Sequence, residues 1–271
     1  MIDAENLLDH DDAAFWGPLR RGHVGADFAG RRLKTDMLAH EISSRLRAAL
    51  DMVMQRRSTH WISAMYLPKH FEGDEAIGRE IMQAHTWALL TTTAEDGAPL
   101  TTHLSLLWQE AGGPHGSLVG HVARANPHWK LFVRPAESLA LFWGPHAYVS
   151  PTWYTPGAKV PTWNYVTVHA YGRPQIIEDT GEALGVLAAL AHEYEPTGPE
   201  GWGLDRLPPG NAEAQTRGIT VFRMPLSRIE TKIKLSQNRE LADRQRVIAK
   251  LEASDSPDAQ GTARWMKRVL P

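Results

Sequence analysis

The chain has 271 residues, of which 42% are hydrophobic and 22% charged, values typical of a globular protein that buries its own core. Its 29 Lys and Arg nearly balance 31 Asp and Glu, for a formal net charge of -2, which excludes a polycation that coats nucleic acid over its whole surface. The absence of Cys excludes disulfides, thiolate metal sites and a cysteine nucleophile. With no basic leader and no apolar run long enough to span a bilayer, we expect a cytoplasmic protein without a membrane segment.

Residues 1–64 differ in composition from the rest of the chain. An imperfect amphipathic pattern predicts one helix over residues 34–57, but the segment lacks the apolar residues for a core of its own. We expect it to be a weakly structured N-terminal extension, or the product of a start codon assigned too far upstream. Residues 65–271 are then expected to form the folded domain without it.

From residue 65 onward, short β-prone runs alternate with amphipathic stretches. Strands are predicted over residues 87–93, 100–108, 117–123, 138–143, 165–177 and 219–233, and helices over 74–85, 180–195, 238–252 and 263–269. The Glu95-Asp96-Gly97 sequence predicts a hairpin turn between the first two strands, and Gly172 a bend in a long strand. About six antiparallel strands with inserted and C-terminal helices predict an α+β fold built on a small β-barrel.

The first candidate site is the segment 120–130, where a strand leads into a short helix. Backbone N–H groups at the helix start, with Arg124 and Lys130 beside them, are suited to bind a phosphate group. The alternative is an ordinary loop in which Asn126 caps the helix and Pro127 is its first residue. The spacing alone favours this alternative.

Two aromatic segments, 143–154 and 160–165, form the second candidate site. Their Trp and Tyr rings alternate with Ser, Thr and Asn side chains, a composition suited to sandwich a planar ring system and to bond its edge atoms. The alternative is a pair of rigid aromatic loops at a subunit interface, where Trp and Tyr are also enriched. Both roles are compatible, since cofactor sites often lie at such interfaces.

The third candidate site is the segment 232–239, which carries basic and amide side chains at the end of a strand. Its Ser-Gln-Asn sequence could cap the following helix and present the helix start to an anion, although such charge runs usually form a solvated face. Other chemistries find no support, because the sequence has no His-Glu-x-x-His, Gly-x-Ser-x-Gly or Walker pattern, and its scattered histidines predict no metal site.

Taken in order, these blocks resemble the FMN-binding negative transcriptional regulators of the PaiB type. The blocks are Met65-Tyr66-Leu67-Pro68, His103-Leu104, Gly120-His121-x-Ala123-Arg124-Ala125-Asn126-Pro127, Gly144-Pro145-x-x-Tyr148-x-Ser150-Pro151-x-Trp153-Tyr154, Val160-Pro161-Thr162-Trp163-Asn164-Tyr165 and Lys232-x-Lys234-Leu235-Ser236-Gln237-Asn238. The resemblance runs from residue 65 to the C-terminal helices. It implies an FMN-binding split β-barrel, a homodimer with flavin at the subunit interface, and repression of transcription.

The resemblance also implies which residues bind the flavin. Arg124 is expected at the phosphate, the strand from His103 to Ser105 at the ring edge, and Lys234, Ser236 and Gln237 closing the site from either subunit. The full set of expected cofactor-binding residues is His103, Ser105, His121, Arg124, Asn126, Lys130, Ser150, Trp153, Trp163, Asn164, Lys234, Ser236 and Gln237.

An enzymatic function, haem binding and the way in which DNA would be contacted stay open at this point. The same barrel also carries flavin reductases and flavin-dependent oxidoreductases, so fold alone does not decide between enzyme and regulator. Haem could bind through His121 or His146. No helix-turn-helix is evident, so any contact with DNA would use a local basic patch. The alternative is that the basic residues of this patch only solvate the faces of their helices. The candidate patch consists of Arg239, Arg244, Arg246, Lys250, Arg264, Lys267 and Arg268.

Overall fold

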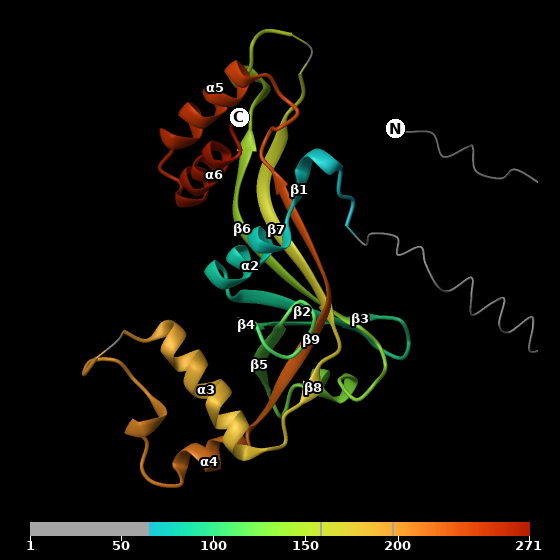
Figure 1. Ribbon diagram of the computed structural model, residues 1–271, viewed down its shortest axis with the longest axis vertical. Coiled ribbons are helices and arrows are strands. Elements are labelled where there is room, and N and C mark those ends of the chain that lie inside the picture. Colours follow the sequence, from blue (N-terminus) through green and yellow to red (C-terminus); the bar gives the residue numbers. More distant parts are fainter. Residues whose placement is uncertain (1–64, 158, 197) are drawn as a thin grey trace, which may run out of the picture. The chain divides into compact units, whose positions relative to one another are not determined.

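The computed structural model describes residues 65–157, 159–196 and 198–271 (Figure 1). The predicted extension over residues 1–64, with its helix at 34–57, lies outside the described residues. Among the helices of the described ranges, none combines the length and the apolar character needed to cross a membrane.

Strands and helices follow one another in the predicted order. The strands are β1 (Glu72–Gly73), β2 (Trp87–Thr93), β3 (Pro99–Ser105), β4 (Leu107–Gln109), β5 (Ser117–Ala123), β6 (Ser138–Val149), β7 (Thr162–Gly172), β8 (Gln175–Ile176) and β9 (Ile219–Lys234). The α-helices are α2 (Glu75–Ala84), α3 (Thr180–Tyr194), α4 (Asn211–Thr216), α5 (Leu241–Glu252) and α6 (Pro257–Arg268). Short 3-10 helices are η1 (Lys69–Phe71), η2 (Pro127–Leu131), η3 (Pro151–Trp153) and η4 (Leu204–Arg206).

The strands form one antiparallel sheet in the order β3-β2-β6-β7-β9-β5-β4, and β1 and β8 also pair with β9. The sheet curls until its ends approach each other. The two edge strands, β3 and β4, are separated in the chain by Leu106 alone, and a Cβ added to Gly120 on β5 would lie 2.8 Å from the Ser105 carbonyl oxygen at the end of β3. Closing a sheet in this way removes most of its unpaired edge. The predicted α+β barrel of antiparallel strands is confirmed.

Strand β9 runs the length of the sheet and joins its two halves. It pairs with β5 through residues 219–225 and with β7 through residues 226–234. The pairing shifts by one residue between Tyr171, which pairs with Arg228, and Gly172, which pairs with Leu226. A Cβ at Gly172 would lie 2.3 Å from the Pro225 carbonyl oxygen, so only glycine fits the predicted bend.

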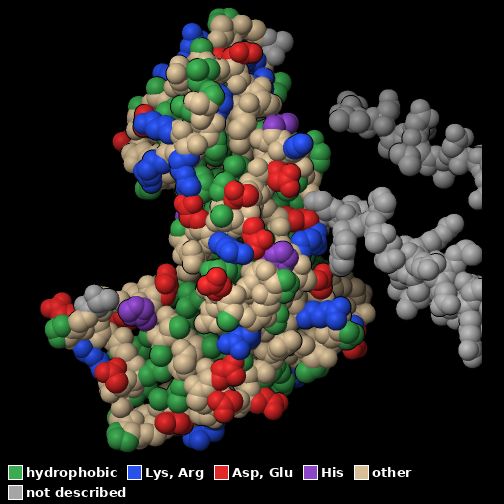
Figure 2. All heavy atoms as spheres, viewed as in Figure 1, with side chains coloured by type: hydrophobic (Ala, Val, Ile, Leu, Met, Phe, Trp, Pro, Cys, Tyr) green, Lys and Arg blue, Asp and Glu red, His purple; other side chains and the backbone are tan. Residues whose placement is uncertain are grey.

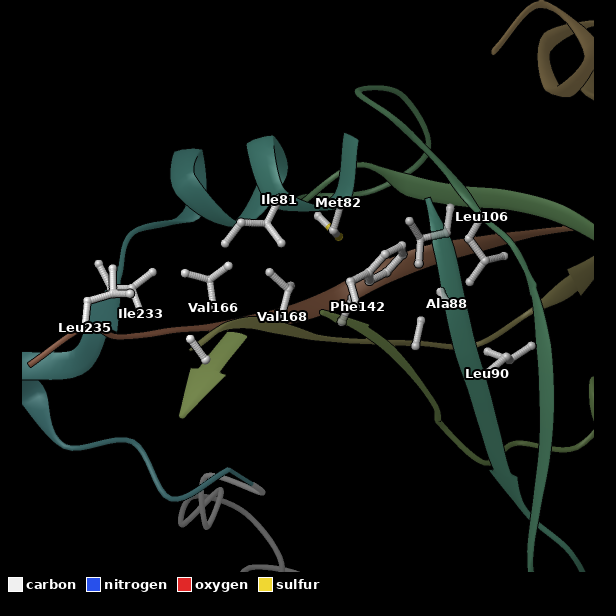
Figure 3. Close-up of a cluster of buried hydrophobic side chains, with 14 of the residues drawn as sticks. Ile81, Met82, Ala88, Leu90, Leu106, Phe142, Val166, Val168, Ile233 and Leu235 are labelled. Carbon is white, nitrogen blue, oxygen red and sulfur yellow. The ribbon is translucent and has the colours of Figure 1, made fainter. Parts of the chain in front are cut away.

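Alternating apolar residues on the strands build the main core. Ala88 and Leu90 on β2, Phe142 on β6, and Val166 and Val168 on β7 are all buried, as the period of two in a strand requires. Figure 3 shows Phe142, Val166 and Val168 below Ile81 and Met82 on α2, which cover this part of the sheet, with Ala88 and Leu90 further along, beside Leu106. A second, smaller cluster packs α3 against β5 and β9.

The structure differs from the predicted elements in several places. The strand predicted over 165–177 ends at Gly172 and β8 follows separately, and the helix predicted over 238–252 begins at Leu241. The strand predicted over 100–108 is divided, because Leu106 turns inward and is fully buried. The strand predicted over 138–143 continues to Val149 past a register shift at residues 143–146, where an aromatic loop was expected. The last helix begins at Pro257 rather than 263, since the Ser256 side chain caps it. Helix α4 was not predicted.

Helices α5 and α6 pack on the far end of β6 and β7 from α3 (Figure 1). Asp243 on α5 anchors them to the segment after η3. Its carboxylate accepts hydrogen bonds from the Thr155 N–H and hydroxyl, both at 2.7 Å, and forms an ion pair with Lys159. These bonds from Lys159 and Thr155 hold the pKa of the Asp243 carboxyl well below its usual range.

Candidate functional site

Two free cations lie where β5 leads into η2. Arg124 directly follows β5, is exposed, and places its guanidinium 5.0 Å from the centre of the Trp129 ring. The Trp129 indole N–H donates to the Arg124 carbonyl at 2.9 Å, so the turn holds ring and guanidinium together. Lys130 is exposed on η2. Within the described residues neither cation forms an ion pair, which leaves both available to an anionic group.

Asn126 caps η2, as the alternative interpretation predicted, with Pro127 as the first residue of the helix. Its side-chain oxygen accepts from the His128 N–H at 3.0 Å, and its amide donates to the Thr102 hydroxyl at 3.1 Å. The polar groups of Asn126 are therefore already engaged within the protein. Its expected contact with FMN stays a prediction.

His128 lies fully buried behind this turn. Its Nδ1 is 2.8 Å from the Thr102 hydroxyl and its Nε2 is 2.9 Å from the Thr92 hydroxyl, which in turn is 2.5 Å from the Ser138 hydroxyl. Burial lowers the pKa of His128 to about 4. The network thus assigns a neutral imidazole that accepts from Thr102 at Nδ1 and donates to Thr92 from Nε2.

On β3, His103 precedes and Ser105 follows the buried Leu104 in the sequence. His103 is exposed and stacks with Trp87 on β2 at 6.5 Å between ring centroids. Ser105 forms a hydrogen bond with the hydroxyl of Tyr194, which also bonds Thr86. Trp87 is 58% exposed, so the two stacked rings offer a flat surface to a planar ligand.

His121 on β5 is half-buried, and burial lowers its pKa. Its Nδ1 is buried and finds no hydrogen-bond partner among the residues that the structure describes. Together with Ser105 it lines one end of a cavity of about 520 Å³ that α3 and α4 cover. Sequence reasoning identified both residues but not the cavity.

The second group of expected residues lies at the other end of β7 and β9. Trp163 is 50% exposed and lines a groove of about 510 Å³ with Trp143, His146 and Tyr165. The Lys234 ammonium donates to the Thr162 hydroxyl at 2.6 Å and to the Trp163 carbonyl at 2.8 Å. Burial, with the neighbouring charges of Lys232 and Arg239, lowers the pKa of Lys234. This groove is the aromatic surface that the sequence predicted.

Three further members of this group bond within the protein. Asn164 is 1% exposed, and its amide exchanges hydrogen bonds with the Ser236 hydroxyl at 2.9 and 3.1 Å. The same amide donates to the Met266 sulfur on α6 at 3.3 Å. The Gln237 side chain accepts from the Leu235 N–H at 2.7 Å and donates to the Ile233 carbonyl. These contacts fix α6 and the end of β9, so in one chain these residues position the groove rather than line it.

Ser150 and Trp153 lie at η3, beyond the end of β6. The Ser150 hydroxyl accepts from the Thr152 N–H at 3.2 Å and caps this short helix. Trp153 is half-buried and packs against the main core. Neither residue lines the groove of Trp163. Their expected contacts with the flavin stay predictions.

The two groups lie at opposite ends of β9. His121 pairs with Val221 and Tyr165 with Lys234, and 13 residues separate Val221 from Lys234, about 40 Å along an extended strand. One chain therefore brings together His103, Ser105, His121, Arg124 and Lys130 at one end. The same chain brings together Trp163, Lys234 and their neighbours at the other end.

Several residues near the first group were not predicted from the sequence. Trp87 and Tyr194 are exposed aromatic residues close to His103 and Ser105. His128 lies two residues after the predicted cap Asn126, but its partners Thr92 and Thr102 lie on distant strands. Groups of three or more His, Asp or Glu able to hold a metal ion do not occur within the described ranges.

Three of the seven residues of the predicted basic patch on α5 and α6 are engaged within the protein. Figure 2 shows Lys and Arg side chains gathered over these helices, with acidic side chains among them. Arg268 pairs with Glu80 at 2.6 and 2.8 Å, and Lys267 pairs with Glu252. Arg244 is buried and donates to the Val269 carbonyl. Arg246, Lys250 and Arg264 stay exposed with no ion pair among the described residues, and the half-buried Arg239 lies 5.2 Å from the centre of the Tyr154 ring.

Comparison with known proteins gives consistent matches. A family model described as "Putative FMN-binding domain" matches residues 65–228. The chain is 36% identical over 211 residues to the protease synthase and sporulation protein PAI 2 of Bacillus subtilis, covering 76% of this chain and 98% of that protein. It is 29% identical over 159 residues to the uncharacterized protein YKL070W of Saccharomyces cerevisiae, covering 51% and 94%. Among solved structures, the FAD and heme binding protein from Mycobacterium smegmatis has 13% identity and a TM-score of 0.47, covering 64% and 77%.

Proposed function

This chain belongs to the PaiB-type family of FMN-binding proteins, and from this premise we propose that two copies of it form a homodimer that holds FMN between them and acts as a negative regulator of transcription. The observation that supports the dimer is the separation of the two groups along β9. The cations Arg124 and Lys130 lie at one end, and the aromatic groove of Trp163 lies at the other. A second copy, reversed against the first, would bring its groove to the cations.

The residues at the β5 end suit the cofactor. FMN carries a phosphate, and Arg124 and Lys130 are exposed cations with no carboxylate partner among the described residues. In this proposal they hold the phosphate, while Ser105 and His121 face the ring edge and His103 with Trp87 cover a ring face. When bound, the flavin supplies electron-transfer chemistry of its own. The protein binds and orients it.

The regulatory part of the proposal is supported by the relative of known name. The Bacillus subtilis protein is named for protease synthesis and sporulation. The match covers 98% of that protein and 76% of this chain. Because Arg244, Lys267 and Arg268 are engaged within the protein, we expect any contact with DNA to use the exposed Arg246, Lys250 and Arg264. A cytoplasmic location, which suits a chain without Cys, is part of this proposal.

The phosphate role is tested by titrating flavins into the purified protein and following the quenching of flavin fluorescence. Arg124→Ala should cost about 1.5–3 kcal/mol of FMN affinity, the range for hydrogen bonds to a charged group. Arg124→Lys should recover part of this loss, since an ammonium lacks the planar fork. Arg173→Ala, at an exposed position with no hydrogen bond or ion pair of its side chain among the described residues, is the matched control. Equal losses for riboflavin and FMN would show that Arg124 does not bind the phosphate.

The dimer is tested by mixing two variants that each lose FMN binding. Arg124→Ala damages the cation end and Trp163→Ala the aromatic end, so both sites of each homodimer are defective. If one copy supplies each end, a mixed dimer contains one intact site, and mixing should restore part of the binding. Sedimentation of each sample confirms that dimers form. Two folded dimeric variants that show no recovery after exchange would refute the shared site.

Regulation is tested by gel shift of duplex DNA at two salt concentrations. Binding through phosphate contacts should fall steeply with salt, and the double change Lys250→Glu and Arg264→Glu should weaken it. Arg173→Glu is the control for the added negative charge. Equal weakening by the control, or no shift at low salt with and without FMN, would refute direct DNA binding.

A further inference from the structure

The segment between β8 and β9 folds into an arm that leaves a cavity against the barrel. The arm comprises α3, η4 and α4, and Figure 1 shows it beside β5. Val186 and Leu190 on α3 pack against Val119 and Val221 and fix the arm to the sheet. Beyond Leu190 the arm still contacts the sheet through the Tyr194 hydroxyl, which bonds Ser105 on β3. A cavity of about 520 Å³ lies there, within the size range of sites for small organic ligands.

The wall of this cavity is mostly apolar. The arm contributes Leu187, Leu190, Trp202, Leu204 and Leu207. Glu195 closes the loop of the arm, because its carboxylate accepts from the Trp202 N–H at 3.2 Å. An indole and four leucine side chains around one space favour a flat, ring-containing molecule, whose binding removes apolar surface from water.

The barrel contributes two polar side chains to the cavity, Ser105 and His121, and the arm adds Glu195 and Gln215. Ser105 is held by Tyr194, and His121 has a buried Nδ1 without a partner in the described part of the chain. An unpaired buried N–H is rarer than an unpaired acceptor, which places the imidazole proton on Nε2. His121 can therefore donate one hydrogen bond to a ligand that enters the cavity.

The charges of the lining select against anions. None of the lining residues is Lys or Arg, and Glu195 is the acidic one among them. An anion in this apolar space would lose its hydration without gaining a counter-ion. The phosphate of FMN, which the exposed Arg124 and Lys130 would hold, is therefore excluded from the cavity.

We propose that the cavity under the α3–α4 arm binds a second ligand, a neutral and mostly apolar molecule of about two fused rings that accepts a hydrogen bond from His121. This goes beyond the proposed flavin binding. Because Ser105 and His121 belong to both sites, such a ligand would lie beside the flavin, where it could act as an effector or as a partner in electron transfer.

Two naphthalenes of equal size test the charge and shape of the site. 2-Naphthamide is neutral and has a carbonyl acceptor, whereas 2-naphthoate is anionic at neutral pH. Titration calorimetry on the full-length, FMN-loaded protein should show one site per chain for the amide. Binding of the carboxylate should be weaker by about tenfold or more. Equal affinities, or no binding of the amide, would overturn the proposal.

Variants that fill the cavity locate the site. Ala191 lines the cavity from α3 and Ala212 lines it from α4. Ala191→Trp should weaken amide binding by about tenfold or more. Ala212→Phe should have the same effect and replaces the first variant if that one folds poorly. Ala188→Trp, on the exposed face of the same helix, is the matched control and should bind normally. Flavin absorbance is recorded in every sample. If filling the cavity releases FMN, or if the amide displaces FMN, the cavity is the site of the flavin ring and the second-ligand proposal is wrong.

Discussion

The buried imidazole of His128 should make the stability of this protein depend on pH in a way that one substitution removes. In the folded protein His128 is fully buried, bonds two threonine hydroxyls, and has a pKa of about 4. In the unfolded chain the same ring has an ordinary pKa near 6.5. Below that pH the unfolded chain therefore binds a proton that the folded protein excludes.

The sign and size of the effect follow from this difference. The contribution of His128 to stability is fully present above pH 6.5 and is lost as the pH falls toward 4. At about 1.4 kcal/mol per pH unit, the complete loss amounts to about 3 kcal/mol. By pH 4.5 about 2.5 kcal/mol should already be lost, a large fraction of the stability of an ordinary domain.

The assay is urea unfolding of the full chain at pH 7.5 and pH 4.5. His128→Gln keeps one donor and one acceptor but cannot be protonated in this range. Between the two pH values the wild type should lose about 2.5 kcal/mol more than this variant. His70→Gln, at an exposed position, controls for the substitution itself. If the wild type and His128→Gln lose equal stability, the ring is not held neutral by the fold and the assigned network is wrong.

Two further substitutions test the packing that positions the site. Gly172→Ala should destabilise the protein by about 1–3 kcal/mol, because the new methyl group would collide with the Pro225 carbonyl. Gly185→Ala on α3, with open space around its Cβ, should instead stabilise by about 0.5–1 kcal/mol, and the reverse order in urea unfolding would contradict this geometry. Asp243→Ala should lower the melting temperature measured by circular dichroism at pH 7, whereas Asp255→Ala, at an exposed position, should not. Equal melting temperatures for these two variants would show that the bonds of Asp243 do not anchor α5.

Local signals in the sequence sufficed for much of the fold. The strand at residues 87–93 has the predicted bounds, since alternation and the turn at Gly97 are properties of neighbouring residues. The Asn126–Pro127 helix start is local for the same reason. Flavin binding could also be predicted, because ordered blocks of residues identify a family even where no single block explains its chemistry.

Tertiary structure decided which polar residues are free to bind a ligand. Asn164 and Ser236, 72 positions apart, form a buried pair, and no local pattern distinguishes them from the exposed Arg124. The cavity beside His121 arises because the α3–α4 arm folds back onto a strand far away in the sequence. Periodicity predicts which face of an element is apolar, but the partner of that face depends on long-range packing. The sequence by itself therefore determined the elements and the cofactor, and the packing of distant segments decided where a ligand can enter.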